Sequence, residues 1–203
     1  VHGDDPNVAP SFARTARAIK RHDCIPCMEL SHGGKYGGVP CPSNPTATGT
    51  HSYGPSEEIT ADGIHVLPMD EEMMKQTAKA FADTARRAYE AGFEMFILHG
   101  GHGWMINQFL SPAVNKRTDQ YGGSTENRCR FPIMCLKKIR EKVGKNFPVD
   151  MRMTGDEIIE GGYHIDEGKK IAQMLSPYVD MIQVSTGGIF HPDATARMSP
   201  GVF

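Results

Sequence analysis

Histidine, arginine and glutamate side chains follow the apolar runs of this sequence, each at the point where a run ends. Glu29 and His32 follow one run, His99 and His102 follow another, and Arg152 ends a third. Imidazole titrates near neutral pH and can donate or accept hydrogen bonds, whereas a guanidinium is a permanent cation. The spacing of the two histidines allows ligand binding, a metal site or local hydrogen bonding. No carboxylate stands at a third ligand position, so we expect no metal.

The elements that must position these residues are four strand-like runs that alternate with helical patterns. The strands are expected at residues 24–30, 94–98, 147–153 and 180–185, and the helices at 10–22, 71–91, 127–143 and 166–175. Asp70 and Ser124 are expected N-caps, and Gly92 is expected to end its helix. The long segments after residues 30 and 98 lack periodicity and are expected to be loops.

The alternation is typical of a parallel sheet with crossover helices. In parallel α/β folds, ligands bind at the carboxyl ends of the strands. All the polar residues named above lie at those ends, as does the segment 186–191 after the last strand. The opposite ends carry only short polar connections. This asymmetry predicts a binding site without reference to any known protein.

The composition favours a small-molecule protein. The 22 Lys and Arg residues nearly balance the 24 Asp and Glu residues, which argues against nucleic acid or an anionic membrane as a partner. The five cysteines are irregularly spaced and no stretch could span a bilayer, so we expect a reduced, cytoplasmic protein. Cys24 and Cys27 suit core packing better than metal binding, because they face opposite sides of a strand.

The segment HGGHGWMINQFLSPAVNKRTDQYGGSTENRCRF, which starts at His99, resembles the signature of the old yellow enzyme family, the NADH:flavin oxidoreductases. The resemblance extends across nearly the whole chain, from ELSHGGK at Glu29 to VSTGG at Val184. Details are similar to the branch with 2,4-dienoyl-CoA reductases, enoate reductases and clostridial bile-acid oxidoreductases. The resemblance implies an α/β fold in which this chain forms about the third to sixth units of a TIM (β/α)8 barrel. A complete barrel needs about 250 residues, so residues 1–203 are expected to be an internal part of one FMN-binding domain, truncated at both ends.

The resemblance implies that His99 and His102 are catalytic residues that donate two hydrogen bonds to a substrate carbonyl. Hydride transfer to the β-carbon of an activated alkene places negative charge on that oxygen, and two donors stabilise it. Trp104 stands where many relatives have the tyrosine that protonates the α-carbon, but an indole N–H has no useful acidity. His191 corresponds to a catalytic histidine of the dienoyl-CoA reductase branch and is the expected acid.

The cofactor-binding residues implied by the resemblance are Glu29, His32 and Arg152. Arg152 corresponds to an arginine beside flavin N1 and O2, where a fixed cation stabilises the reduced ring. The residues alone leave a second interpretation open, an ion pair of Arg152 with Glu29 or Asp150. Glu29 replaces a glutamine of many relatives, so it can accept from flavin N3–H but cannot donate. Residues 117–128 are expected to form a tight, ion-paired loop without a chemical role.

The implied function is FMN-dependent reduction of the activated C=C bond of an α,β-unsaturated carbonyl compound, with NAD(P)H as hydride source. The substrate could be an enone, an enoate or a dienoyl thioester, including a 3-oxo-4-ene steroid or bile acid. FAD and an iron–sulfur cluster would lie outside this chain, and an oligomer is compatible with it. The family holds the flavin phosphate after strands seven and eight, so the isolated chain is expected to bind FMN poorly and to be inactive. Amine oxidation of the trimethylamine dehydrogenase type and a non-catalytic remnant remain as alternatives.

Overall fold

A computed structural model describes residues 3, 5–37, 49, 51–60 and 63–188 of the chain. The expected acid His191 therefore lies outside the described residues. The helices are α1 (Ala9–Lys20), α2 (Glu71–Glu90), α3 (Met105–Leu110), α4 (Thr125–Val143) and α5 (Ile165–Leu175), with short 3-10 turns at Pro6–Val8, Gly34–Tyr36 and Ser176–Tyr178. The strands are β1 (Cys27–Leu30), β2 (His51–Gly54), β3 (Glu58–Ile59), β4 (His65–Pro68), β5 (Met95–Gly100), β6 (Val149–Asp156) and β7 (Met181–Thr186).

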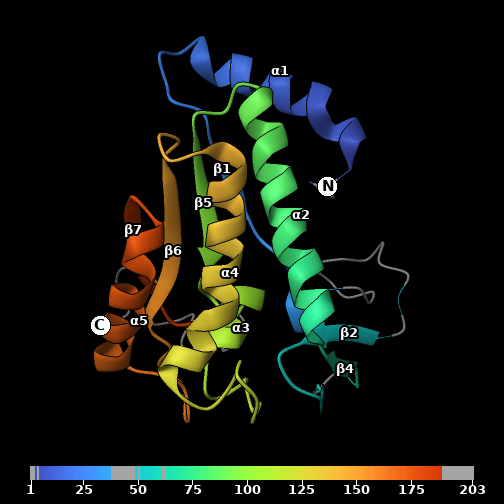
Figure 1. The fold of residues 1–203 in the computed structure, drawn as a ribbon, viewed down its shortest axis with the longest axis vertical. Coiled ribbons are helices and arrows are strands. Elements are labelled where there is room, and N and C mark those ends of the chain that lie inside the picture. The colour runs from blue at the N-terminus through green and yellow to red at the C-terminus, as the bar shows by residue number, and fades with distance from the viewer. Residues whose placement is uncertain (1–2, 4, 38–48, 50, 61–62, 189–203) are drawn as a thin grey trace, which may run out of the picture.

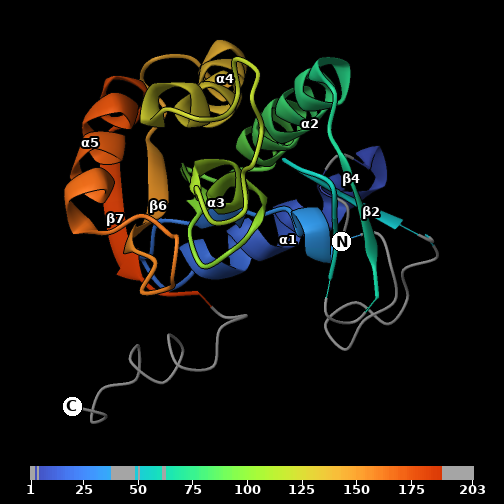
Figure 2. The same cartoon turned by 90° about the horizontal axis from the view of Figure 1, so that it is seen from below.

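Four of these strands form one parallel sheet in the order β1-β5-β6-β7, which is also their order along the chain. Helices α2, α4 and α5 lie side by side over one face of this sheet (Figures 1 and 2). Helix α3 and the small strands lie at the end where β1 and β5 finish, whereas α1 lies at the opposite end (Figure 1). The predicted parallel α/β arrangement is therefore confirmed.

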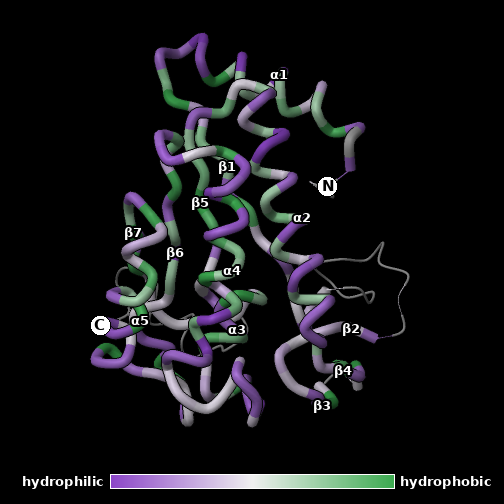
Figure 3. The backbone as a smooth tube through the Cα atoms, in the orientation of Figure 1, coloured by the Kyte–Doolittle hydropathy of each residue, from purple (hydrophilic) through white to green (hydrophobic). Residues whose placement is uncertain are grey.

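The core lies between this sheet and its helices. Successive side chains of a strand point to opposite faces, so each strand contributes every second residue to the core. The strand residues on the helix-covered face are apolar and buried: Leu30, Phe96, Leu98, Val149, Met151 and Met153. Hydrophobic residues concentrate in the strands, whereas the loops at the two ends are mainly hydrophilic (Figure 3). Burial of one such large side chain contributes roughly 1.5–3 kcal/mol to folding.

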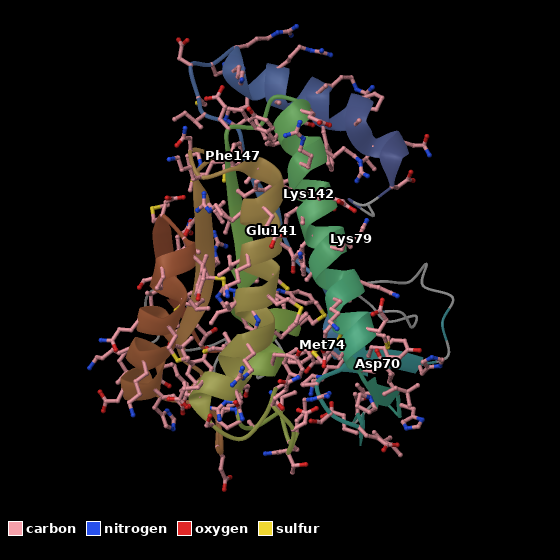
Figure 4. All side chains as sticks on the ribbon, in the orientation of Figure 1. Asp70, Met74, Lys79, Glu141, Lys142 and Phe147 are labelled. Carbon is pink, nitrogen blue, oxygen red and sulfur yellow. The ribbon has the colours of Figure 1, made fainter. Side chains whose placement is uncertain are left out.

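The two longest helices begin at the predicted caps. Asp70 Oδ1 accepts from the backbone N–H of Met73 at 2.7 Å, and Ser124 Oγ accepts from that of Asn127 at 3.3 Å. Helix α2 ends just before Gly92, whose positive φ of 100° suits glycine. Side chains of α2 and α4 project from adjacent ribbons in Figure 4. No helix among the described residues is long and apolar enough to cross a membrane.

Two predicted strands begin too early, and proline is the reason in both cases. β1 starts at Cys27 rather than Cys24, and β6 starts at Val149 rather than Phe147. Pro26 and Pro148 have no N–H to donate to a neighbouring strand, so regular pairing begins after them. β5 runs two residues further than predicted and includes His99, which pairs in register with Arg152. His99 is therefore part of the sheet rather than of the loop after it.

The two long segments predicted as loops contain regular structure. The first holds a small sheet in the order β2-β4-β3, and the second holds α3. The strands have only two to four residues, which is too short for a periodic pattern to be recognised. All six residues of α3 are buried, so the helix has no polar face that a periodic pattern could reveal.

The loop between α3 and α4 is fixed by two arginines, as predicted. Arg117 pairs with Asp119, and its Nη1 also donates to the carbonyls of Pro55 and Met69 at 2.9 and 2.8 Å. Arg128 is buried and pairs with Glu167 of α5. These contacts attach the loop to the small sheet on one side and to α5 on the other.

Candidate active site

Strands β1, β5 and β6 bring Glu29, His99 and Arg152 to one face of the sheet. His99 is in register with Arg152, and Arg152 with Gln183. Glu29 is in register with Ile97, two residues before His99. Because side chains two residues apart share a face, all these residues lie opposite the helix-covered face. This side of the sheet has no covering helix among the described residues, and we call it the inner face.

A hydrogen-bonded chain crosses the inner face from β1 to β7. Glu29 Oε1 accepts from His99 Nδ1, because a carboxylate can only accept. His99 Nε2 lies 3.2 Å from His102 Nδ1, and His102 Nε2 contacts Ser185 Oγ. The side chain of His99 is 10% exposed, whereas that of Glu29 is 32% exposed. The two histidines are thus brought together, with one ring nitrogen of each within hydrogen-bonding distance of the other.

Arg152 lies beside these hydrogen-bonded residues and contacts the same carboxylate oxygen of Glu29. Its Nη1 is 3.4 Å from Glu29 Oε1, and its Nη2 donates to Gln183 Oε1 at 3.1 Å. Gln183 in turn donates to Asp150 Oδ2. Of the two ion pairs that the sequence left open, the one with Glu29 is present. The arginine side chain is still 32% exposed, so its guanidinium also reaches the open side of the sheet.

Asp150 supports this arrangement from inside the sheet. It is fully buried, and burial raises the pKa of its carboxyl. Its Oδ2 accepts from Gln183, while Oδ1 has no partner among the described residues. Asp150 therefore orients the amide that holds Arg152.

His102 lies in a tight turn after β5. Its φ is 59° and that of Gly103 is 85°, so the turn places a histidine in the left-handed region. The N–H of His102 donates to Thr154 Oγ1 at 2.9 Å, and the N–H of Gly103 donates to Asn107 Oδ1 at 2.7 Å. Burial lowers the pKa of His102, and the neighbouring His99 and Arg152 lower it further. These surroundings therefore favour the neutral form of the imidazole.

A buried polar network lies behind this turn. Asn107 Nδ2 donates to Glu157 Oε1 at 3.2 Å, and Ser111 Oγ and the N–H of Tyr163 donate to Glu157 Oε2 at 2.8 and 3.0 Å. Burial raises the pKa of Glu157 to about 6. Asn107 thus joins the backbone of the histidine turn to an acid that is only 5% exposed.

His32 and Trp104 are placed at the rim of the same end of the sheet. The backbone carbonyl of His32 accepts from the N–H of Met105 at 3.0 Å, which joins the loop after β1 to the start of α3. The His32 ring is exposed, and its Nδ1 accepts from the N–H of Gly34 at 3.0 Å. Trp104 is the half-buried N-cap residue of α3. Trp104 directly follows the histidine turn along the chain, whereas His32 is joined to this region through the backbone of Met105.

Four residues of the site were missed by the sequence interpretation: Asn107, Thr154, Gln183 and Ser185. Gln183 and Ser185 alternate on β7, and this alternation is the one available signal that they face the same side as Arg152. Thr154 and Asn107 act through backbone contacts of a turn, and no sequence spacing indicates such contacts. Among the described residues no three His, Cys, Asp or Glu side chains converge as metal ligands.

One cavity of the described structure does not coincide with this cluster. It has a volume of about 650 Å³ and lies between β1, α1 and α2. It touches Glu29 and His32, but its other walls include apolar side chains such as Phe12, Met28 and Phe81. We locate the candidate site at the inner face, because the charged and hydrogen-bonding groups converge there.

Comparison with known proteins gives a family match over almost the whole chain. The model of the NADH:flavin oxidoreductase / NADH oxidase family matches residues 4–202. An NADH oxidase of Thermoanaerobacter brockii is 35% identical over 91% of this chain and 28% of its own length. An NADPH dehydrogenase of Clostridium acetobutylicum is 34% identical over 89% of this chain and 52% of its own length. The chain therefore spans about a quarter to a half of these relatives.

Solved structures agree with this match. A 2-naphthoyl-CoA reductase in complex with 2-naphthoyl-CoA superposes with a TM-score of 0.85 at 30% identity, over 97% of this chain and 32% of its own. Histamine dehydrogenase from Rhizobium sp. 4-9 superposes with a TM-score of 0.78 at 29% identity, over 95% and 29%. An old yellow enzyme homologue from Zymomonas mobilis, at 22% identity and a TM-score of 0.75 over 92% and 54%, shows the fold alone. These likenesses confirm the predicted partial (β/α)8 barrel.

Proposed function

Because this chain belongs to the NADH:flavin oxidoreductase / NADH oxidase family, we propose that the whole protein is an FMN-dependent oxidoreductase. It reduces the activated C=C bond of an α,β-unsaturated carbonyl compound, with NAD(P)H as the source of hydride. Residues 1–203 form part of its FMN-binding barrel domain. The observation that carries this proposal is the pair of imidazole nitrogens, His99 Nε2 and His102 Nδ1, held 3.2 Å apart beside Arg152.

The residues of the inner face fit a flavin ring. The side chain of Arg152 is about a third exposed, and its cation suits the N1 and O2 edge, where negative charge gathers on reduction. Glu29 supplies an acceptor for a ring N–H, and the exposed His32 lies at the rim beside it. When bound there, FMN would supply a hydride to the carbon β to the substrate carbonyl.

The two histidines would bind the carbonyl oxygen of the substrate. An oxygen about 2.9 Å from each nitrogen forms a triangle with the 3.2 Å side, so one acceptor can take both hydrogen bonds. Negative charge grows on this oxygen as the β-carbon is reduced, and donors that are already in place stabilise it. The contacts of His99 with Glu29 and of His102 with Ser185 hold the two rings before the substrate arrives, and Thr154 holds the backbone of His102.

The proton for the α-carbon must come from a group other than Trp104, because indole is not a useful acid. We propose His191 as this acid, since imidazole titrates near neutral pH. Trp104, at the start of α3, is proposed to form part of the wall of the substrate pocket. The likeness to a reductase bound to 2-naphthoyl-CoA supports a conjugated thioester as one substrate class.

A second candidate function is oxidation of an amine. The likeness to histamine dehydrogenase, at 29% identity, favours it. In enone reduction the substrate receives a hydride, whereas in amine oxidation the substrate gives one up. An amine donor needs no oxyanion donors, whereas the paired imidazoles and Arg152 form a site for negative charge. We therefore place enone reduction first.

The test is made on the whole protein, expressed from its complete coding sequence. We expect a yellow protein whose visible spectrum bleaches on anaerobic addition of NADH or NADPH. Addition of an enone or enoyl thioester to the reduced protein should then restore the oxidised spectrum. Histamine or dimethylglycine, added instead to the oxidised protein, should not bleach its spectrum. Bleaching by an amine with no reoxidation by any unsaturated carbonyl compound would select the second candidate. A colourless protein would leave only a non-catalytic remnant.

A further inference from the structure

Gln183 on β7 joins two residues of β6 across the inner face of the sheet. Arg152 is in register with Gln183, and Asp150 lies two residues before Arg152 on the same face. A guanidinium has only donors, so the atom of Gln183 that lies 3.1 Å from Arg152 Nη2 must be the carbonyl oxygen Oε1. The amide nitrogen then points the other way and donates to Asp150 Oδ2. The arginine therefore fixes the direction of both hydrogen bonds.

The carboxyl of Asp150 supports this amide from a fully buried position. Its Oδ1 has no hydrogen-bond partner among the described residues. Burial raises the pKa of the carboxyl, and Oδ2 can accept the amide hydrogen whether or not Oδ1 carries a proton. A buried polar group with incomplete hydrogen bonding costs stability, and an apolar side chain would avoid this cost. The hydrogen bond to Gln183 is thus a contribution that an apolar residue could not replace.

Arg152 is held from two sides by acceptors on different strands. Its Nη1 lies 3.4 Å from Glu29 Oε1 of β1, and its Nη2 donates to Gln183 of β7. A guanidinium is flat and rigid, so contacts at both Nη atoms fix its position and its plane. Loss of the contact with Gln183 would leave the ion pair with Glu29 and let the cation shift toward β1.

We propose that Asp150 and Gln183 are positioning residues that raise the reduction potential of the flavin by holding Arg152 against its N1 and O2 edge; this rests on the proposed function. Reduction places negative charge at that edge, and a cation fixed beside it stabilises the reduced ring more than the oxidised ring. A cation that is free to shift away stabilises the reduced ring less. Neither Asp150 nor Gln183 needs to touch the flavin for this effect.

A purely electrostatic role of Asp150 predicts a change of the opposite sign. A negative charge near the flavin disfavours the reduced ring, so removal of that charge alone would raise the potential. Removal of the acceptor for Gln183 releases the amide and Arg152, which lowers the potential. Asp150→Asn removes the charge but keeps an acceptor oxygen, whereas Asp150→Leu removes both. Because neither variant carries a charge at this position, the difference between them isolates the hydrogen bond.

The reduction potential is measured on the whole flavoprotein by anaerobic equilibration with a dye of known potential, with visible spectra giving the reduced fraction of each. Gln183→Leu should lower the equilibrium constant for reduction by about tenfold, which is about 30 mV for a two-electron couple. Asp150→Leu should lie about as far below Asp150→Asn, and Asp150→Asn should not lie below wild type.

Gln120→Leu is the matched control. Gln120 also donates from Nε2 to a carboxylate, that of Glu71, at 3.2 Å. Gln120 lies in the loop between α3 and α4, and Glu71 lies at the start of α2, so this pair is not part of the inner face. The equilibrium constant for reduction should stay within about twofold of wild type, as expected for an exposed contact away from the flavin.

Equal or reversed potentials for Asp150→Asn and Asp150→Leu would show that Asp150 does not act through the hydrogen bond. A potential of Gln183→Leu that is not below wild type would show that the amide does not position Arg152. Either result overturns the proposal. Should Asp150→Leu not fold, Asp150→Ala removes the same acceptor and takes its place in the comparison.

Two further outcomes separate this inference from the proposed function. A whole protein that purifies without flavin would refute the proposed function, and the inference would fall with it. A flavoprotein that reduces enones but has the same potential in all these variants would refute the inference alone.

Discussion

At the scale of single residues, His102 combines a chemical role with a backbone conformation that few side chains adopt. Its φ of 59° favours glycine or asparagine, and a substituted residue other than these is strained. We predict that His102→Ala and His102→Gly each slow reoxidation of the reduced flavin by an enone by about 100- to 1,000-fold, because one donor to the oxyanion is lost. His102→Asn keeps an N–H donor and should lose far less.

The same series separates donor loss from backbone strain. His102→Gly should melt at a higher temperature than His102→Ala, since glycine accepts the positive φ without cost. The rates are read by anaerobic stopped-flow spectroscopy, and stability by thermal unfolding. Equal rates for the Asn and Ala variants would show that the side chain of His102 donates nothing to the substrate.

The candidate residues that the sequence could predict are ionisable side chains within or at the end of apolar strands. Glu29, His99 and Arg152 each interrupt an apolar strand, and a buried or half-buried charge there requires a partner. Ser185 and Gln183 carry common polar groups that occur on any surface strand, so their contacts with His102 and Arg152 became visible only in the structure. The proposed roles of His191 and Trp104 come from family resemblance and remain predictions.

At the scale of elements, α3 determines where the histidine turn lies. We predict that Asn107→Ala lowers the free energy of unfolding by roughly 1–3 kcal/mol, because buried donors on Gly103 and acceptors on Glu157 lose their partner. The variant should also raise KM for the enone through displacement of His102. Urea unfolding and steady-state kinetics check the two effects.

Gln76→Ala on α2 is the control for this variant. Gln76 is an exposed amide that bonds only Glu72 of its own helix among the contacts described, so its loss should change stability by less than about 0.5 kcal/mol. An Asn107→Ala protein as stable as Gln76→Ala would mean that the hydrogen bonds of Asn107 with Gly103 and Glu157 contribute little to the free energy of unfolding.

The strands of the main layer were predictable from their apolar runs and the helices from their periodic patterns, and two of the helices also have a recognisable cap. Asp70 and Ser124 mark the starts of α2 and α4 through side-chain bonds to the next turn. The small sheet β2-β4-β3 and α3 were not predictable, since strands of two to four residues and a fully buried helix have no periodicity of their own. Their form depends on contacts with distant segments, such as Arg117 with Pro55 and Met69.

At the scale of the whole molecule, these 203 residues include the inner face, and the contacts to the flavin phosphate are predicted to lie outside them. We predict that the chain expressed alone binds FMN at least about a hundredfold more weakly than the whole protein, because two or more charge-assisted hydrogen bonds to the phosphate are lost. Quenching of FMN fluorescence measures both affinities. Lumiflavin, which has no phosphate, is the control and should show a smaller difference. Equal FMN affinities would place the phosphate contacts within this chain.

The pairing of His99 with Arg152 across β5 and β6 has a consequence for how such a site can change. On each strand, the residue before a site residue packs into the core between the sheet and its helices, as Leu98 and Met151 do. The position of the site residues on the inner face therefore depends on the packing of the apolar residues on the helix-covered face. A methyl group gained or lost beneath the sheet would tilt the strand and re-aim the imidazole without any substitution in the pocket. Selectivity could in this way drift through mutations that never meet the substrate.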